Sequence, residues 1–167
     1  DISLEEGETS NDSIVWSNLL AAPYNPSTIV YGDTLYVLND IGSRGFAAFN
    51  AKTGEPDAMV TGFCTIKGFP CALGVMNFAF LGGSMGMVVG EKIAMLCEEA
   101  VIRRLPLVLF SCSGGARMHE GAVSLMQMAK TCAALGRLRE QGGFYISVCT
   151  HPTTGGVTTS WSMAADV

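Results

Sequence analysis

Two adjacent glycines are the residues whose type and spacing point most directly to chemistry. Gly114 and Gly115 follow an apolar run over residues 106–113 and precede a stretch with helical periodicity. Because glycine has no side chain, the backbone N–H groups at such a turn lie open, and the positive end of the helix dipole reinforces them. The pattern predicts either a site for an oxyanion or a phosphate, or a tight turn that allows close helix packing.

The same order of strand, Gly-Gly turn and helix occurs three times. The glycine pairs are Gly82-Gly83, which Ser84 follows, Gly114-Gly115 and Gly155-Gly156. The strands are expected over residues 71–80, 106–113 and 144–149, and the helices that follow them end at about residues 104, 141 and 166. Repeated units of this kind predict an α/β fold whose turns meet along one edge of the sheet.

A hydrolase is an alternative, because residues 82–86 also fit the G-x-S-x-G pattern between a strand and a helix. Ser84, then Glu120 or Glu140, then His151 would follow one another in the order of a catalytic triad. Stoichiometric labelling of Ser84 by a fluorophosphonate would support this alternative.

The composition is that of a folded domain. The 167 residues are 49% apolar and 15% charged, which is enough for one sizeable core. A net charge of -5 argues against a nucleic-acid partner. No run reaches the length of a membrane span, and the charged first residues do not resemble a signal peptide, so neither a membrane nor secretion is expected.

The six cysteines contain no C-x-x-C pair and fall mostly within predicted strands and helices. They are Cys64, Cys71, Cys97, Cys112, Cys132 and Cys149. We expect reduced, buried thiols and no bound metal. Elemental analysis that found about one zinc per chain would contradict this expectation.

The first fifty residues follow a β pattern instead. Residues 29–40 predict two strands joined by a Gly-Asp turn, and residues 45–55 add a third strand and a turn. Residues 14–56 resemble one blade of a quinoprotein-type β-propeller, and a single blade cannot bury its own faces. A non-catalytic binding module is therefore a third alternative, and expressing residues 1–50 alone would test it.

Five ordered segments carry a resemblance to a known family. They are Asp57-Ala58-Met59-Val60-Thr61-Gly62, residues 77–86, Ser113-Gly114-Gly115-Ala116-Arg117-Met118, residues 124–131 and Pro152-Thr153-Thr154-Gly155-Gly156-Val157. Residues 51–167 resemble the carboxyltransferase β subunit of bacterial and plastid acetyl-CoA carboxylase. We therefore expect two parts, residues 1–50 and residues 51–167, joined between about residues 50 and 57 as in a fusion or composite sequence. The second part is expected to be a partial domain, and the family's upstream zinc ribbon with two C-x-x-C pairs does not occur in this sequence.

The resemblance implies an incomplete crotonase-like (ClpP/crotonase) spiral of β-β-α units, with the β-rich segment before it. In that family acetyl-CoA loses a methyl proton, and the enolate attacks carbon dioxide released from carboxybiotin to give malonyl-CoA for fatty acid synthesis. Gly114 and Gly115 match the pair whose N–H groups stabilise the enolate oxygen.

Other positions are implied to bind substrate. Gly82, Gly83 and Ser84 would line the coenzyme A side. Arg117 would orient the turn or meet a phosphate, or would form a structural salt bridge. Gly155 and Gly156 would shape the pocket floor or let the last helix pack.

The family also implies partners. A carboxyltransferase α subunit, a biotin carboxyl carrier protein that bears carboxybiotin, and biotin carboxylase would form a hetero-oligomer in the cytoplasm, or in the plastid stroma of a plant. The isolated chain would then be inactive, because the biotin-facing half of the site comes from the α subunit.

Some residues depart from the family pattern or fall on an apolar stripe. His119 and His151 stand where glutamine and aspartate are usual, Cys112 stands for alanine, and Trp161 stands for phenylalanine. The change at His151 removes a carboxylate that would cap the N–H groups of the last turn. The stripe Leu125, Met128, Ala129, Cys132 and Leu135 has helical spacing and is expected to be core.

Overall fold

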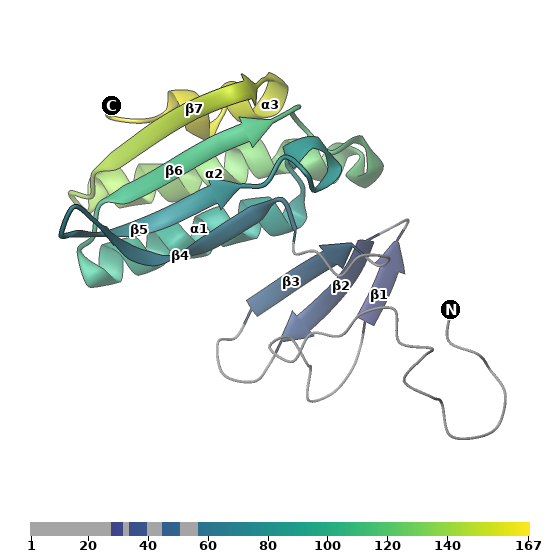
Figure 1. Ribbon diagram of the computed structural model, residues 1–167, viewed down its shortest axis with the longest axis horizontal. Helices are drawn as coiled ribbons and strands as arrows, with labels where there is room; N and C mark the ends of the chain where they lie inside the picture. Colours follow the sequence, from purple (N-terminus) through teal and green to yellow (C-terminus); the bar gives the residue numbers. More distant parts are fainter. Residues whose placement is uncertain (1–27, 32–33, 40–44, 51–56) are drawn as a thin grey trace, which may run out of the picture. The chain divides into compact units, whose positions relative to one another are not determined.

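The computed structural model describes residues 57–167 in full and, before them, the backbone of three strands (Figure 1). These are β1 (Thr28–Tyr31), β2 (Thr34–Asn39) and β3 (Gly45–Asn50), which form an antiparallel sheet in that order. The predicted strands of the N-terminal segment are thus confirmed, while the Gly-Asp turn at residues 32–33 and the join at residues 51–56 lie outside the described residues. The chain divides into two compact units, Asp1–Pro56 and Asp57–Val167.

The second unit is a four-stranded sheet covered by helices. Its strands are β4 (Met59–Ile66), β5 (Phe69–Met76), β6 (Leu107–Ser113) and β7 (Tyr145–Thr153), in the order β4-β5-β6-β7. The first two form an antiparallel hairpin, and β5, β6 and β7 are parallel. The helices α1 (Met87–Arg103) and α2 (Ala122–Glu140) lie on one face of this sheet (Figure 1).

Short helical segments complete the turns after the parallel strands. They are η2 (Leu81–Gly83), η3 (Met118–Glu120), α3 (Gly155–Thr158) and η4 (Trp161–Met163). The helix predicted to follow the second glycine pair and to end at about residue 141 begins only at Ala122, because Gly121 has a left-handed φ of 54°. The strand β4 was not predicted from the sequence; together with β5 and α1 it forms a β-β-α motif.

The core of this unit lies between the sheet and the two long helices. Its fully buried side chains include Leu107 and Leu109 of β6, Ile93 of α1 and Trp161 of η4. Continuous apolar runs such as β6 are typical of parallel strands, because helices or other strands cover them. In the part of the chain that the structure describes, no helix has both the length and the apolar character needed to cross a bilayer.

The predicted core stripe on α2 is wrong for three of its five residues. Leu125 is 49% exposed, and Ala129 and Cys132 are exposed, whereas Leu135 is buried and Met128 is partly buried against the core. In the first half of α2 the buried residues are instead Ser124, Gln127 and Thr131, and in the second half they are Ala134, Leu135 and Leu138.

Hydrogen bonds inside the helix accompany the burial of the three polar side chains of α2. Ser124 Oγ donates to Gly121 O, Gln127 Nε2 to Val123 O and Thr131 Oγ1 to Gln127 O. These bonds satisfy the two hydroxyl groups and Gln127 Nε2, which would otherwise oppose burial, while Gln127 Oε1 is buried without a partner among the described residues. Gly90 of α1 leaves the space that the Gln127 side chain fills. The outward face is apolar, and we name it the α2 stripe: Ala122, Leu125, Met126, Ala129, Cys132 and Ala133.

Candidate functional site

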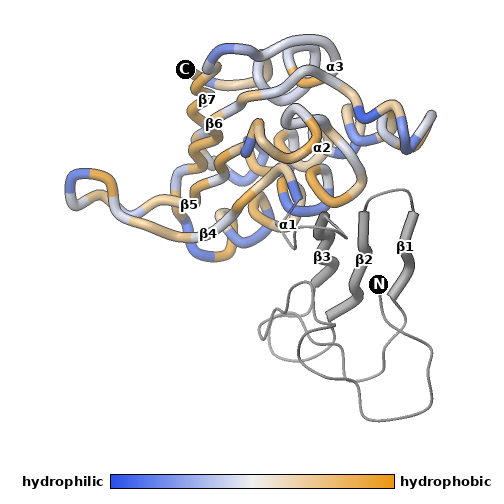
Figure 2. Tube along the Cα trace, turned by 45° about the vertical axis from the view of Figure 1, so that its right-hand side comes forward, coloured by the Kyte–Doolittle hydropathy of each residue, from blue (hydrophilic) through white to orange (hydrophobic). Residues whose placement is uncertain are grey.

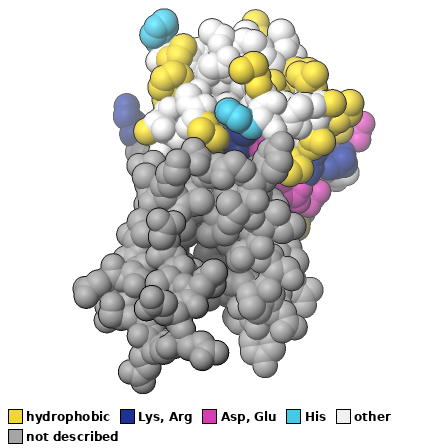
Figure 3. Space-filling model, turned by 90° about the vertical axis from the view of Figure 1, so that its right-hand side faces the viewer, with side chains coloured by type: hydrophobic (Ala, Val, Ile, Leu, Met, Phe, Trp, Pro, Cys, Tyr) yellow, Lys and Arg dark blue, Asp and Glu magenta, His cyan; other side chains and the backbone are white. Residues whose placement is uncertain are grey.

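The three Gly-Gly turns meet at the edge of the sheet where the parallel strands end. Gly114 N donates to Gly82 O at 2.9 Å, which joins the first two turns. A Cβ atom on Gly115 would lie 3.5 Å from the Cα atom of Gly155, so the second and third turns are in contact. The predicted convergence of the turns is confirmed. Figure 3 looks onto this side of the unit, where both histidines of the chain lie among apolar side chains.

The two candidate oxyanion donors already have acceptors within the chain. Gly114 N–H is held by Gly82 O, and Gly115 N–H donates to Ser113 Oγ at 3.0 Å. These two acceptors differ in kind, because a carbonyl oxygen is fixed by its backbone whereas a hydroxyl rotates with its side chain. Gly115 N–H is therefore the donor that a ligand oxygen can take over with the smaller rearrangement.

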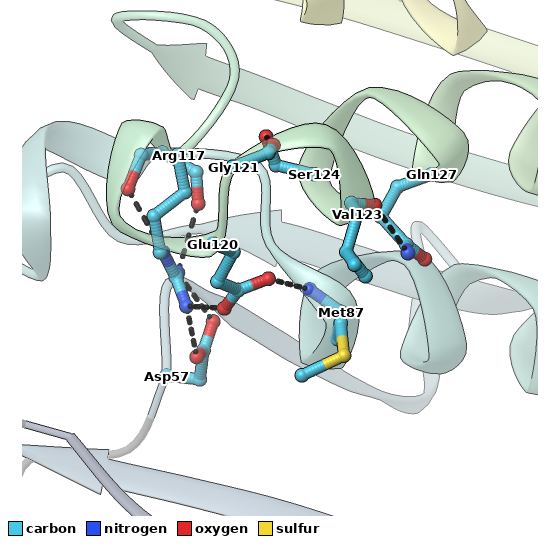
Figure 4. Close-up of polar contacts among 9 residues, drawn as sticks. Asp57, Met87, Arg117, Glu120, Gly121, Val123, Ser124 and Gln127 are labelled. Atoms are coloured by element: carbon cyan, nitrogen blue, oxygen red, sulfur yellow. Dashed lines mark hydrogen bonds and ion pairs between the residues drawn. The ribbon is translucent and has the colours of Figure 1, made fainter. Parts of the chain in front are cut away.

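Arg117 lies in a buried ionic cluster. Its side chain is 1% exposed and makes two hydrogen bonds of 3.0 Å to the Asp57 carboxylate, whose own side chain is 0% exposed. It also donates to Glu120 Oε1 and to the hydroxyl and carbonyl oxygens of Ser84. Figure 4 shows the guanidinium between the two carboxylates. All five N–H groups of a guanidinium are used in this way, which favours the structural salt bridge over contact with a phosphate.

Glu120 links this cluster to the start of α1. Its Oε2 atom accepts a hydrogen bond from Met87 N at 2.6 Å, and Met87 is the first residue of the helix (Figure 4). A carboxylate at a helix N-terminus satisfies a free backbone donor and interacts favourably with the helix dipole. The cluster therefore ties β4, the first turn and the second turn to one another.

Among residues 57–167, no side chain that could act as a base is hydrogen-bonded to Ser84. Its Oγ atom accepts a hydrogen bond from Arg117 Nε at 3.1 Å, so the neighbouring group is a cation and not an imidazole. The serine of a hydrolase elbow sits directly between strand and helix, whereas β5 ends at Met76 and α1 begins at Met87. Of the other proposed triad members, Glu120 is held by Arg117, and Glu140 and His151 are exposed. These contacts count against the hydrolase alternative.

The third turn is shaped by close packing. A Cβ atom on Gly156 would lie 3.0 Å from Met85 Cε and 3.1 Å from Met128 Sδ, and Gly155 has a φ of 57°. The left-handed backbone favours glycine at position 155, and at position 156 a side chain would require the two methionine side chains to shift. Thr154 N donates to Ser113 O at 3.0 Å, so a backbone carbonyl accepts from one of the N–H groups that the family's aspartate, replaced here by His151, was expected to cap.

The departures from the family pattern are accommodated locally. Trp161 is fully buried, and its indole N–H donates to Ser111 Oγ at 3.0 Å. Cys112 is partly buried, with its thiol 3.6 Å from His151 O. His151 lies within β7 and, like His119, is exposed.

The expectation that the thiols are mostly buried holds for only part of the set. Cys71 and Cys97 are buried, Cys64 and Cys112 are intermediate, and Cys132 and Cys149 are exposed, all as free cysteines. Burial raises the pKa of the Cys97 thiol to about 12. Residues 57–167 contain no group of three or more side chains arranged to hold a metal ion.

Burial also lowers the pKa of Lys92, although the Asp57 charge opposes this effect. Its Nζ atom donates to Met59 O at 2.7 Å, which fastens α1 to the first strand of the sheet.

Sequence reasoning missed two residues that hold the turns together. Asp57 opens the first of the five resembling segments, and the carboxylate that a buried arginine requires as a partner is its side chain. Ser113 precedes the glycine pair, and its hydroxyl accepts the Gly115 N–H. A serine two residues before a turn donor is a known local hydrogen-bond pattern, so this contact was available from the sequence.

Comparison with known proteins gives a consistent set of relatives. Residues 34–164 match the family described as "Carboxyl transferase domain". The chain is 59% identical over 121 residues to the acetyl-coenzyme A carboxylase carboxyl transferase subunit beta of Synechococcus sp. (strain JA-3-3Ab), covering 72% of this chain and 38% of that protein. It is 60% identical over 113 residues to the protein of the same name from Alkaliphilus oremlandii (strain OhILAs), covering 68% of this chain and 41% of that protein. The chain thus spans less than half the length of these two relatives.

A solved structure shows the same fold. Transcarboxylase 12S, determined with hydrolysed methylmalonyl-coenzyme A bound, is 33% identical with a TM-score of 0.61, over 65% of this chain and 21% of that chain. The family match begins within β2, ahead of the join that was expected between residues 50 and 57.

Proposed function

Because the chain belongs to the carboxyl transferase domain family, we propose that it forms part of the carboxyltransferase β subunit of an acetyl-CoA carboxylase. The proposed reaction transfers a carboxyl group from carboxybiotin to acetyl-CoA and gives malonyl-CoA for fatty acid synthesis. The identity of 59–60% to two proteins of that name supports this assignment. The convergence of three glycine turns on one edge of the sheet is the observation that carries the proposed site.

The chemistry requires stabilisation of a developing oxyanion. Removal of a methyl proton from a thioester places negative charge on the thioester oxygen, and a donor already in position stabilises that charge most effectively. Gly115 N–H is the proposed donor, released when the Ser113 hydroxyl turns away from it. Gly114 N–H is the second proposed donor, but using it requires separation from Gly82 O. Carboxybiotin supplies the carbon dioxide that the enolate carbon attacks.

The glycines around this donor admit a thioester because they carry no side chains. Gly82, Gly83 and Ser84 are proposed to lie on the coenzyme A side, and Gly155 and Gly156 are proposed to form the floor. Arg117 holds the first two turns together through its bonds to Asp57, Ser84 and Glu120. It is therefore proposed to position the turns without contacting the substrate.

The exposed apolar side chains of the α2 stripe support the proposal that the protein has several subunits. Leu125 and Met126 are 49% and 63% exposed on a helix that is otherwise packed against α1. Contiguous exposed apolar side chains are typical of surfaces that another chain or domain covers. We propose that a carboxyltransferase α subunit, a biotin carboxyl carrier protein and biotin carboxylase complete the enzyme, in the cytoplasm or a plastid stroma.

Reconstitution tests the proposed function. A β chain extended to the length of its relatives is combined with an α subunit and a carboxylated biotin carrier, and malonyl-CoA formation from acetyl-CoA is measured. The variants are Gly115→Ala and, as the matched control, Gly62→Ala. No atom lies within 4 Å of a Cβ atom built on Gly62, whereas Gly115 has a φ of 115° and touches the third turn.

Alanine keeps the N–H group, but a Cβ atom at a φ of 115° strains the turn and moves that donor from its position. We therefore expect Gly115→Ala to lower kcat by up to about a hundredfold, the effect of losing one oxyanion donor, and Gly62→Ala to leave kcat unchanged. The near-UV circular dichroism of each variant checks that the fold is retained. Equal rates for the two variants would refute the role of Gly115. Malonyl-CoA production by the 167-residue chain alone, at the rate of the full complex, would refute the shared site.

A further inference from the structure

Two cysteines face each other near the tip of the β4–β5 hairpin. In the antiparallel register of these strands Cys64 is paired with Cys71, and the chain reverses at Lys67 and Gly68. The Sγ atoms are 3.5 Å apart. Figure 2 shows that this hairpin projects beyond the helices, so its tip is reached from solvent.

The geometry of this pair fits a disulfide. Directly opposed residues in an antiparallel sheet have Cα atoms about 4.5–5.5 Å apart, which falls within the range of about 4.4–6.8 Å found for disulfides. The thiols are already in contact, so rotation of the two side chains is sufficient to bring the sulfur atoms to bonding distance. Among residues 57–167, which contain all six cysteines, this is the one contact between two thiols.

The two thiols differ in their access to an oxidant. Cys71 is 3% exposed, and burial together with the neighbouring Cys64 thiol raises its pKa. Cys64 is partly exposed and stands on the edge strand of the sheet. An external disulfide therefore meets Cys64 first, while Cys71 is held in place to react second.

We propose that Cys64 and Cys71 are a site of reversible oxidation, at which a disulfide forms across the tip of the hairpin. The oxidant is a disulfide compound, either glutathione disulfide or an oxidised dithiol protein. The Cys64 thiolate attacks one sulfur of that disulfide and expels the first thiolate. The Cys71 thiolate then attacks Cys64 Sγ and expels the second. The pair loses two protons and two electrons, and the oxidant is reduced to two thiols.

The reaction changes the mobility of the hairpin without changing its register. In the reduced state only backbone bonds and side-chain packing hold the tip, and its Phe69 side chain is 75% exposed. The covalent bond prevents the two strands from separating or slipping. Amide hydrogen exchange at the tip is therefore slower in the oxidised chain.

Peptide mapping tests the proposal directly, because a trypsin site lies between the two cysteines. The chain is equilibrated with glutathione disulfide, free thiols are blocked with N-ethylmaleimide, and the protein is digested. Cleavage after Lys67 places Cys64 in residues 53–67 and Cys71 in residues 68–92, with no other cysteine in either peptide. We expect the two peptides to be joined in the oxidised sample and separate after treatment with dithiothreitol.

Controls separate this reaction from general thiol oxidation. A mixture of ¹⁵N-labelled and unlabelled chains is expected to give only pairs of like label, as an intramolecular bond requires. In Cys64→Ser the joined pair is expected to vanish, while Cys132 and Cys149 still form mixed disulfides with glutathione. Phenylarsine oxide, which binds two adjacent thiols together, is expected to bind the reduced chain at one site and to lose that site in Cys64→Ser. Unlinked Cys64 and Cys71 under conditions that modify Cys132 and Cys149, or pairs of mixed label, would overturn the proposal.

Discussion

Replacement of the buried guanidinium tests whether Arg117 holds the turns together. Arg117→Met keeps a long side chain but removes the charge, which leaves the fully buried Asp57 carboxylate without its two hydrogen bonds. Removing one partner of a buried ion pair destabilises a protein by about 3–5 kcal/mol. Because whole domains are stable by only about 5–15 kcal/mol, this change is a large part of the total.

Asp57→Asn is a milder change, for which we expect a smaller loss of stability. Asp57→Asn keeps the shape of the side chain, and Arg117 retains Glu120 and Ser84. Since hydrogen bonds to charged groups contribute about 1.5–3 kcal/mol, we expect a loss within this range, below that of Arg117→Met.

Urea unfolding followed by far-UV circular dichroism measures the free energy of unfolding for each variant. The matched control is Arg137→Met, because Arg137 pairs with Glu98 at 3.5 Å while both side chains are about 60% exposed. Exposed pairs contribute little, so we expect the control to change stability by about 0.5 kcal/mol or less. If Arg117→Met lowered the free energy of unfolding no more than the control, the structural role of Arg117 would be refuted. The Arg117 side chain would then be a candidate for contact with the substrate.

Further outcomes follow from burial, from backbone contact and from the exposed stripe. Burial raises the pKa of Cys97 to about 12, so the folded chain keeps a proton that the unfolded chain loses above about pH 8.5. This contribution to stability is complete below that pH and is lost as the pH rises towards 12, so Cys97→Ala is expected to flatten the alkaline fall in urea midpoint. Gly83→Ala is expected to prevent folding or lower the thermal midpoint sharply, because its Cβ atom would overlap the Cys112 carbonyl oxygen; an unchanged midpoint in a thermal melt would contradict this contact. The isolated chain is expected to self-associate through the α2 stripe, and Leu125→Gln with Met126→Gln is expected to shift it towards monomer in analytical ultracentrifugation; an identical sedimentation profile would exclude the stripe as the cause.

The sequence by itself determined the order of the three parallel strands, the glycine turns and the two long helices of the second unit, but not its first strand, β4. Glycine pairs after apolar runs mark places where the chain must turn sharply and where a helix can approach closely, and both constraints are local. The convergence of Gly82, Gly114 and Gly155 on one edge followed from the same pattern, because parallel strands end on the same side. The family resemblance added the chemistry proposed for those turns.

Only the tertiary structure decided which face of α2 is buried. Helical periodicity identifies an apolar face, but it does not say whether that face meets this unit or another surface. Ser124 and Thr131 are buried with their hydroxyl groups bonded within the helix, as is Gln127 Nε2, whereas Gln127 Oε1 is buried without a hydrogen-bond partner among the described residues.

The partners of individual polar groups were likewise beyond the sequence pattern. Arg117 meets Asp57 across sixty positions of the chain, and Gly114 N–H is taken by Gly82 O of the first turn and not left open. The facing thiols of Cys64 and Cys71 depend on the register of a hairpin whose first strand was not predicted. Such contacts join groups whose separation is set by how whole strands and helices pack, and a local pattern carries no information on that packing.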